Sequence, residues 1–373
     1  GTANRFCWIS DSRFSRATSP QMEVESLAYW AERKGIGLLG TGDFTHPEHL
    51  RDLENKLAPA PDGFYRLRRG DAPVRFVPTT EIANMYKQDG RGRRVHTVLI
   101  ARSLESVREI NRALASRGNV AADGRPILGF SVRHLCKLVT DIDPETLVIP
   151  AHIWTPWFSV LGEKSGFDSI AEAFGEEWSK LPAVETGLSS DPEMNWRLSQ
   201  LDPFRIISNS DAHSPAKIGR ECNAFEAPLT WTRLREGLFG RGGSRLRFTV
   251  EFFPEEGKYH WPGHRACKTV LAPADFRAAG GRCPVCGRPL THGVASRVDA
   301  LADRPEGFRP PGAPPSVHLV PLDEIIGDAL GMGSASKRVA NVWDRLVEAG
   351  GGEMRVLLAM ELGELAACAG EAV

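Results

Sequence analysis

The sequence predicts an α/β protein built around a distorted β/α barrel, and three observations support this fold class. Short apolar runs alternate with stretches of helical periodicity through about residue 252, and strands that alternate with helices indicate a parallel sheet. His, Asp and Glu residues recur at the edges of the apolar runs. Because the strand ends of a β/α barrel meet on the face where active sites are built, this recurrence favours a barrel over an open sheet.

The predicted strands follow one another along the chain, and most of them end just before a polar residue. Five apolar runs show this order: 35–40 before Asp43, 74–78 before Glu81, 147–150 before His152, 183–184 before Glu185, and 205–207 before Asp211. His96 is an exception, because its apolar run at 98–100 follows it.

The helices are predicted from apolar periodicity and from start signals. Ser19 and Pro20 indicate a helix that continues to about residue 34, since Ser is a preferred N-cap and Pro suits the first helical position. Further helices are expected at 104–116, 170–181, 324–330, 334–349 and from about 354.

The polar residues at the strand edges predict a metal-dependent hydrolase. Imidazole and carboxylate groups together suit zinc, manganese or iron, and several of them suit a multinuclear hydrolytic site. Any one of them alone is as often a hydrogen-bonded structural residue, but many buried polar groups need a common partner, which a metal supplies. The pair Asp211 and His213 is the most specific part, because side chains at i and i+2 can address neighbouring metals.

A second set of ligands predicts a structural zinc site. His264 and Cys267 form one short pair, and Cys283 and Cys286 form another after a loop of fifteen residues. Two short ligand pairs separated by a loop are typical of four-coordinate structural zinc. His260 is an alternative fourth ligand, and a redox pair of the last two cysteines is the competing interpretation.

The composition divides the chain into three parts. Residues 1–252 are predicted to form the barrel, residues 253–311 a zinc-binding module, and residues 312–373 a helical C-terminal region. Residues 257–311 contain nine Lys or Arg against four Asp or Glu, a local net charge of +5. The run of residues 310–315, which is rich in proline, is expected to be a stiff linker.

The whole chain has a net charge of −1, which excludes bulk attraction to nucleic acid, so any basic footprint must be local. The candidates for such a footprint are Arg91, Arg93, Arg94, Tyr259, Trp261, Arg265, Lys268 and Arg288. Trp154 and Trp157, just after His152, either stack on a base or pack as a rim. Seven cysteines, three of them in the zinc motif, no signal-peptide run and no apolar run long enough for a bilayer predict a cytoplasmic protein without membrane contact.

Longer sequence motifs resemble the polymerase-and-histidinol-phosphatase (PHP) superfamily and, more narrowly, the endonuclease Q family of DNA-repair nucleases. The resemblance covers nearly the whole chain in the expected order. It rests on the four zinc-motif residues and on SRFSRATS (12–19), GTGDFTHP (40–47), PAHIWTPW (150–157), ETGLSSD (185–191), SNSDAHS (208–214) and LADRPEG (301–307).

The resemblance implies a PHP barrel, a zinc-binding insert and an endonuclease that nicks DNA 5′ to deaminated bases (hypoxanthine, uracil, xanthine) or abasic sites. Repair or replication proteins are the expected protein partners. The implied catalytic residues are Glu81, His152, Asp211 and His213. Two or three divalent metals, zinc, manganese or magnesium, would be bound by Asp11, Asp43, His46, Glu81, His96, His152, Asp211 and His213.

The chain departs from the family pattern at its start. The two His residues of the usual Asp-Leu-His-x-His-Ser motif fall on Ile9 and Asp11. One explanation is that one metal site is incomplete. The other explanation, which we favour, is that residues 1 to about 11 are not the native start. A catalytically impaired DNA-binding protein is therefore one alternative function, and a small-molecule phosphoesterase of the same superfamily is another.

Overall fold

The computed structural model describes residues 3–7, 12–257 and 259–369, and these residues form the mixed α/β fold that the sequence predicts. The strands are β1 (Ala3–Cys7), β2 (Leu38–Gly40), β3 (Leu57–Pro59), β4 (Tyr65–Leu67), β5 (Arg75–Val77), β6 (Thr79–Gln88), β7 (Arg91–Ile100), β8 (Ile127–Leu128), β9 (Leu147–Pro150), β10 (Ala183–Glu185), β11 (Arg205–Ile207), β12 (Cys222–Glu226), β13 (Leu246–Glu251), β14 (Gly263–His264), β15 (Thr269–Val270) and β16 (Ser316–His318). The helices are α1 (Val24–Lys34), α2 (Pro47–Lys56), α3 (Leu104–Ala115), α4 (Val132–Ile142), α5 (Ile170–Phe174), α6 (Pro192–Asn195), α7 (Trp231–Leu238), α8 (Pro273–Ala278), α9 (Val294–Leu301), α10 (Leu322–Ala329), α11 (Lys337–Gly350), α12 (Glu353–Ala359) and α13 (Leu362–Ala369).

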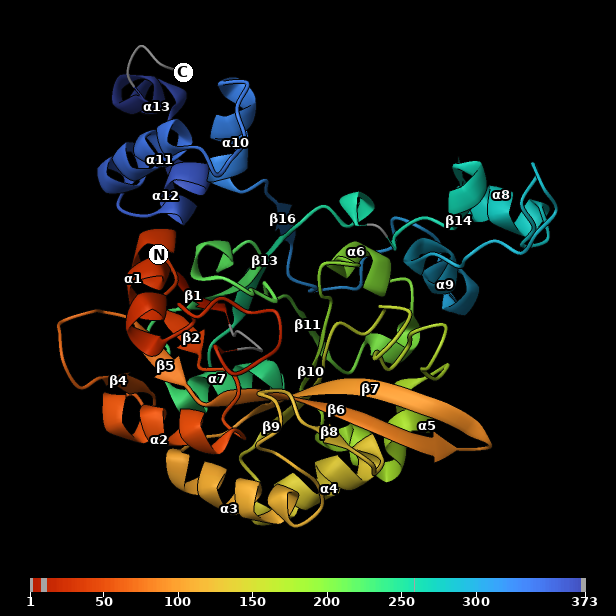
Figure 1. Cartoon of the computed structure of the whole chain (residues 1–373), viewed down its shortest axis with the longest axis horizontal. Helices are drawn as coiled ribbons and strands as arrows, with labels where there is room; N and C mark the ends of the chain where they lie inside the picture. The colour runs from red at the N-terminus through yellow and green to blue at the C-terminus, as the bar shows by residue number, and fades with distance from the viewer. Residues whose placement is uncertain (1–2, 8–11, 258, 370–373) are drawn as a thin grey trace.

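The strands pair in both directions, so the prediction of a parallel sheet is only partly right. An eight-stranded sheet has the order β16-β13-β12-β1-β2-β5-β4-β3, and a four-stranded sheet has the order β8-β6-β7-β9. The pairs β1–β2, β2–β5 and β10–β11 are parallel, whereas β1–β12, β12–β13, β6–β7 and β7–β9 are antiparallel. The long β6–β7 hairpin, drawn in orange, extends past the neighbouring strands (Figure 1).

Backbone hydrogen bonds connect the sheets where the strands end, although the described strands do not form one continuous ladder. The N–H of Phe44 donates to the carbonyl of Thr79 at 3.1 Å, which joins the loop after β2 in the eight-stranded sheet to β6 in the four-stranded sheet. The N–H of Ile153 donates to the carbonyl of Glu185 at 3.0 Å, which joins the loop after β9 to β10. These links gather the strand ends that carry the predicted site.

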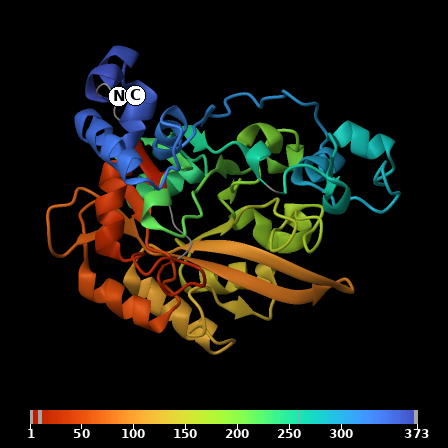
Figure 2. The same ribbon diagram turned by 45° about the horizontal axis from the view of Figure 1, so that its top comes forward.

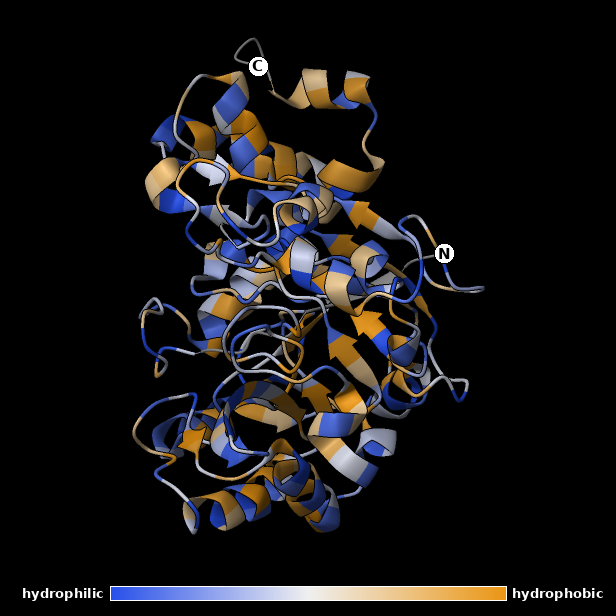
Figure 3. Cartoon of the chain, turned by 90° about the vertical axis from the view of Figure 1, so that its right-hand side faces the viewer, coloured by the Kyte–Doolittle hydropathy of each residue, from blue (hydrophilic) through white to orange (hydrophobic). Residues whose placement is uncertain are grey.

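The helices bury one apolar side against the strands. On α3 the buried residues recur every three or four positions, and the Ser103 hydroxyl caps the helix by accepting from the N–H of Ser106. On α4 the Ser131 hydroxyl makes the same contact with His134. A side-chain oxygen that accepts from an early N–H satisfies one of the unpaired donors of a helix start. Hydropathy colouring shows largely apolar strands, with helices that have both apolar and polar sides (Figure 3).

Two predicted helices have different bounds in the structure. The first was expected from Ser19, but α1 begins at Val24, because Ser19 instead forms a turn with Met22 and donates its N–H to the carbonyl of His213. The helix expected at 170–181 ends at Phe174, since Gly175 has a φ of 54° and the chain continues as a 3₁₀ turn.

Two smaller parts lie on opposite sides of the main body (Figures 1 and 2). One contains the β14–β15 ladder with α8 and α9, and the other contains helices α10 to α13, which lie next to α1. Between them β16 pairs in parallel with β13, so residues 316–318 belong to the main sheet. None of the helices in the described ranges is long and apolar enough to cross a membrane.

Candidate metal centre and active site

Three of the predicted site residues have left-handed backbone conformations, which residues other than glycine rarely adopt. The φ angles are 48° at Asp43, 29° at His152 and 45° at Asp211. Each residue follows a short strand, β2, β9 or β11. Such conformations cost of order 1–3 kcal/mol each and gather at functional sites. The unfavourable backbone at these three strand ends therefore lowers local stability, and it sets the positions of the Asp43, His152 and Asp211 side chains.

Glu81, His96 and His152 bring their ligand atoms together in a buried cluster. Glu81 lies on β6, His96 lies on the antiparallel strand β7, and His152 follows β9. Nδ1 of His96 is 2.7 Å from Oε1 of Glu81 and 2.9 Å from Nε2 of His152. One ligand atom from each residue lies within 4.8 Å of the others, an arrangement that can hold a metal ion. The hairpin thus brings His96 to the site from within a strand.

The charges in this cluster shift the pKa of each group. Burial opposes ionisation of Glu81, yet the positive charge of the two imidazoles and of Arg125 holds the pKa of Glu81 well below its usual range. Burial also opposes a charge on His152, but the Glu81 and Glu185 carboxylates raise the pKa of His152 to about 9. Burial lowers the pKa of His96. A cation that binds here must therefore displace a proton from His152.

Two buried carboxylate oxygens in this region have no hydrogen-bond partner within the described part of the chain. They are Oε2 of Glu81 and Oδ1 of Asp211. Asp211 is close enough for its charge to contribute to the raised pKa of His152. A buried carboxylate oxygen without a donor is unfavourable unless a cation satisfies it. These two carboxylates, with His96 and His152, fit a divalent metal of the zinc or manganese type.

Two further residues contact the cluster, although neither was among the predicted ligands. Glu185 is buried at the end of β10, and its Oε1 is 3.9 Å from Nδ1 of His152. Its place after an apolar run was a usable signal. Arg125 donates to Oε1 of Glu81 at 3.0 Å from the loop before β8. No apolar run precedes Arg125, so the strand-edge pattern does not find it.

Asp43 and His46 lie in a neighbouring environment of their own. The Asp43 carboxylate accepts hydrogen bonds from the backbone N–H and hydroxyl of Ser12, at 2.5 and 2.7 Å, and from the hydroxyl of Ser15 at 2.9 Å. Burial raises the pKa of Asp43 to about 6 against these hydrogen bonds. His46 stacks on Phe14 with ring centroids 4.4 Å apart. Its Nδ1 is buried and has no hydrogen-bond partner among the described residues.

Of the two remaining predicted ligands, one lies outside the cluster and the other lies outside the described residues. His213 is exposed, and its Nδ1 lies 2.8 Å from the backbone carbonyl of Asp211. Asp11, like Ile9, lies outside the described residues. After β11, Asp211 thus faces the buried cluster, whereas His213 faces solvent.

A buried polar layer holds the segment that carries Asp211. The side-chain amide of Asn223 on β12 bonds both the N–H and the carbonyl of Ser208, at 2.9 and 2.8 Å. The hydroxyl of Ser208 donates to Glu251 at the end of β13, and the hydroxyl of Thr249 does so at 2.6 Å. Burial raises the pKa of Glu251 to about 8. The position of Asp211 therefore depends on side chains from two other strands.

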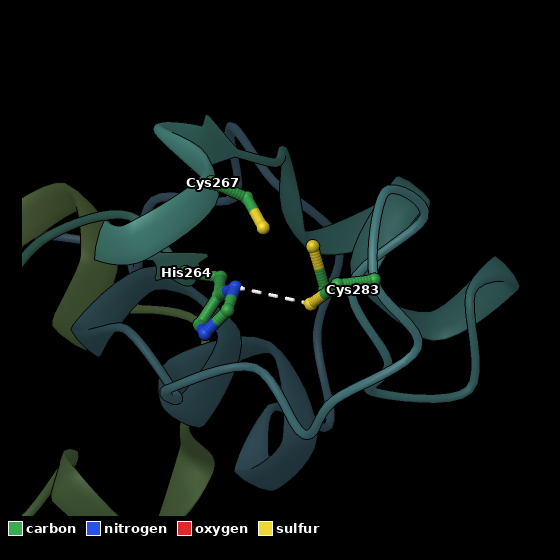
Figure 4. A group of neighbouring side chains, drawn as sticks. His264, Cys267 and Cys283 are labelled. Carbon is green, nitrogen blue, oxygen red and sulfur yellow. Dashed lines mark hydrogen bonds between the residues drawn. The ribbon is translucent and has the colours of Figure 1, made fainter.

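The four residues of the predicted zinc motif form a second cluster, far along the chain from the first. His264, Cys267, Cys283 and Cys286 place one ligand atom each within 4.8 Å of the others. Figure 4 shows the sulfurs of Cys267 and Cys283 and the ring of His264 directed toward a common centre. A hydrogen bond with Thr269 lowers the pKa of the Cys283 thiol to about 6. His and thiolate groups at this spacing suit a tetrahedral ion.

The residues around that cluster include exposed aromatic side chains. His260, the alternative fourth ligand, packs edge-on against Trp261 with ring centroids 4.6 Å apart and is not part of the cluster. Tyr259 and Trp261 are exposed. His264 is therefore the fourth residue of the zinc motif. The neighbouring Tyr259 and Trp261 lie on the protein surface.

The two tryptophans after His152 have different surroundings. Trp154 is 1% exposed and donates its indole N–H to Asn195 at 2.8 Å, so it belongs to the core. Trp157 is 51% exposed, and the guanidinium of Arg94 lies 5.1 Å from its ring centroid. Arg93, which like Arg94 was a candidate for the basic footprint, is buried and donates to the carbonyl of Gly166. One tryptophan and one arginine thus remain available at the surface near the site.

An α/β scaffold with a buried His and Glu cluster at its strand ends, and a separate His and Cys cluster, is typical of metal-dependent hydrolases. Comparison with known proteins narrows this class. The chain is 32% identical to the uncharacterized protein YqxK of Bacillus subtilis over 334 residues, which are 88% of this chain and 79% of YqxK. A family model described as the MJ0043 C-terminal domain matches residues 321–373.

Two solved structures resemble nearly the whole chain. The crystal structure of the lesion-specific endonuclease PfuEndoQ from Pyrococcus furiosus matches with a TM-score of 0.87 and 32% identity, over 98% of this chain and 88% of that one. Endonuclease Q in complex with a 27-mer duplex substrate with an abasic lesion at the active site matches with a TM-score of 0.85 and 31% identity, over 98% and 89% of the two chains. The chain belongs to the endonuclease Q family.

Proposed function

We propose that this chain is a metal-dependent DNA endonuclease that nicks the phosphodiester 5′ to deaminated bases or abasic sites. The buried cluster of Glu81, His96 and His152 carries the proposal, because together with Asp211 it offers ligands and unsatisfied carboxylate oxygens that need a cation. The family supports DNA as the substrate, since endonuclease Q is known in complex with an abasic duplex. Hypoxanthine, uracil and xanthine are the deaminated bases that the sequence resemblance implies.

The barrel metals would be two or three zinc, manganese or magnesium ions. Glu81, His96, His152 and Asp211 are the proposed principal ligands, and His213, Asp43, His46 and Asp11 are proposed to complete the set. Bound divalent metals lower the pKa of a coordinated water and neutralise charge on a phosphate.

The surrounding residues have distinct tasks in this proposal. Glu185 faces Nδ1 of His152, while Nε2 faces the cluster. A carboxylate on the second nitrogen of a ligating imidazole fixes its tautomer and raises its basicity. Arg125 bonds Glu81 and is partly exposed, so its guanidinium is placed to attract a phosphate group of DNA. Glu185 thus orients His152, and Arg125 neutralises negative charge. Neither residue needs to transfer a proton.

Recognition of the lesion is proposed to use the exposed Trp157 and the adjacent Arg94. An aromatic ring can stack on a base, and an arginine can bind the phosphate backbone. A deaminated base has a carbonyl where its parent has an amine, so a backbone N–H aimed at that carbonyl would accept the lesion and leave the parent base unpaired. Reading that edge requires the nucleotide to leave the stack.

The second cluster is proposed to bind one structural zinc ion through His264, Cys267, Cys283 and Cys286. Its chemistry favours zinc over magnesium, because thiolates are soft ligands. The exposed Tyr259 and Trp261 next to it are placed to extend the DNA-binding surface.

An end-labelled duplex with one deoxyinosine tests the proposed activity. We expect one nick on the 5′ side of the inosine with manganese, magnesium or zinc, none after addition of a chelator, and none in an undamaged duplex. Asp211→Asn should abolish nicking while DNA binding persists, and Asp141→Asn serves as the matched control, since Asp141 is exposed and pairs with Lys137 on the same helix. Nicking by the Asp211→Asn protein at the wild-type rate would refute the assigned site.

The substitution of Ile9 and Asp11 by His tests the impaired alternative. If the chain binds damaged duplex without nicking it, and Ile9→His with Asp11→His restores nicking, the natural chain is an impaired member of the family. If neither protein nicks DNA but both hydrolyse a free phosphomonoester, the small-molecule alternative holds. Activity of the unchanged chain would show that the missing His pair is dispensable.

A further inference from the structure

A large cavity lies at the opposite end of the strands from the metal cluster. It has a volume of about 790 Å³ and is bordered by the start of β11, the start of β13, the glycine-rich turn after α7 and residues 309–315. The far ends of β11 and β13 meet each other, because the hydroxyl of Ser208 donates to Glu251 there. The six residues of β13 separate the two ends by about 17 Å. The cavity is therefore distinct from the proposed active site.

The charged side chains that line this cavity are all positive. Its lining contains Arg205, Arg245, Arg247 and Arg309 and no acidic side chain. Arg245 pairs with Glu226 at 2.9 Å, whereas the other three have no acidic partner among the ion pairs of the described ranges. Arginines that are gathered without carboxylates repel one another and attract an anion, most strongly one with several oxygens.

Glycines keep the cavity open around these arginines. A Cβ at Gly240 would lie 2.5 Å from Nη2 of Arg205, so any side chain there would displace the guanidinium. Gly242 and Gly312 have no heavy atom within 4 Å of the place a Cβ would take. The lining thus combines guanidinium groups with backbone that a ligand can approach closely.

A second, smaller cavity adjoins the first beneath the same proline-rich segment. Its volume is about 270 Å³, and it shares Arg205 and residues 310–314 with the first cavity. Its other lining residues include Trp196 and Phe204, which are largely buried. Arg309 connects the two, since its guanidinium lies 5.5 Å from the ring centroid of Trp196 and donates to the carbonyl of Ala313 at 2.6 Å.

We propose that these adjoining cavities form a binding site for a small phosphorylated nucleotide, with its phosphates among the arginines and its base near Trp196 and Phe204. The volume of the larger cavity alone, about 790 Å³, lies in the range of small-molecule sites, which are concave and join apolar walls to a few charged groups. A DNA duplex, about 20 Å wide, is too large to enter such a cavity. The site is independent of the proposed nuclease reaction and would be occupied whether or not the chain nicks DNA.

Titration calorimetry of the full chain with ADP, pyrophosphate and adenosine tests the site. We expect ADP to bind, and pyrophosphate and adenosine each to bind at least tenfold more weakly. Arg205→Gln and Arg247→Gln should each weaken ADP binding about tenfold or more, as expected for loss of a charge-assisted contact. Arg241→Gln is the matched control, since Arg241 is exposed on the same turn, stacks on Phe239 and does not line either cavity.

Several results would overturn the proposal. ADP binding that is unchanged in Arg205→Gln and Arg247→Gln places the nucleotide elsewhere, and binding lost in Asp211→Asn places it at the barrel metals. Equal affinity for pyrophosphate and ADP leaves an inorganic anion site without a place for a base. No ADP binding at millimolar concentration, together with weaker binding of duplex DNA by the two variants, assigns the arginines to a DNA surface. The melting temperature of each variant shows whether it is folded.

Discussion

Glu353 connects the C-terminal helices to the main body, and its removal gives a stability prediction that can be worked out from contacts. Its carboxylate accepts from Nζ of Lys34 on α1 at 2.5 Å, from the indole N–H of Trp343 at 2.9 Å and from the N–H of Leu322 at 3.2 Å. The side chains of Lys34 and Glu353 are only 5% and 3% exposed. Glu353→Ala therefore leaves one buried charge and two buried donors without an acceptor.

The expected loss is large compared with the stability of a protein. Breaking a buried ion pair by removal of one partner costs about 3–5 kcal/mol, because the other charge stays buried. A buried donor that loses its acceptor adds about 1–3 kcal/mol, but contributions within one network are not additive. We therefore expect Glu353→Ala to lower the free energy of unfolding by about 4–6 kcal/mol, out of a total of about 5–15 kcal/mol.

Urea unfolding followed by circular dichroism measures this loss. Glu348→Ala is the matched control, since Glu348 is exposed on α11 and its loss should change stability by no more than about 0.5 kcal/mol. The pair Lys34→Met with Glu353→Gln should recover about half of the loss or more, because it removes the unpaired charge and keeps one amide oxygen that can accept from either Trp343 or Leu322. A Glu353→Ala protein as stable as the Glu348→Ala control would refute the reasoning.

Three further predictions concern the main body, the zinc motif and the surface. Burial raises the pKa of Glu251 to about 8, so its carboxyl in the folded protein keeps a proton that the unfolded chain loses above a pKa of 4.5. The stability of the wild-type protein therefore falls as pH rises from 4.5 to about 8. Glu251→Gln should remove up to about 1.4 kcal/mol per pH unit of this fall, measured as melting temperature against pH, with the exposed Glu256→Gln tracking wild type. Cys286→Ser should remove about one zinc per chain by elemental analysis and lower the melting temperature. Trp154→Ala should lower the unfolding free energy by about 3–5 kcal/mol. Trp157→Ala should leave that free energy unchanged within about 0.5 kcal/mol and should raise KM for the damaged duplex. A larger loss of stability in Trp157→Ala than in Trp154→Ala would contradict the assigned burial.

The sequence predicts those features that depend on local pattern. The helix at 104–116 is confirmed almost to the residue, because its apolar period and its Ser103 cap are both local signals. The C-terminal helices follow for the same reason. The zinc motif is equally local, since two short ligand pairs need only one loop to meet, and the structure brings all four ligands together.

Features that depend on contacts between distant segments are harder to predict. Arg125 lies on an irregular loop and reaches Glu81 only through the fold. Trp154 and Trp157 have the same residue type and nearly the same place in the sequence, yet only one is buried. The position of His96 before its apolar run was the hint of the antiparallel hairpin, because a strand that approaches the site from the other direction presents its ligand in reverse order.

Several unfavourable features of the main body lie at the residues that the proposed chemistry needs. Asp43, His152 and Asp211 are three of the seven described residues other than glycine that have a left-handed backbone. The buried carboxylate oxygens without a hydrogen bond among the described residues include those of Glu81 and Asp211, and Oε2 of Glu251 is another. Neither feature lowers the free energy of the folded protein, and elsewhere buried polar groups are normally paired. A cation offsets the unsatisfied oxygens directly, because it replaces the missing donors and also removes the proton from His152. The local geometry is therefore better explained by binding of a metal than by folding of the chain.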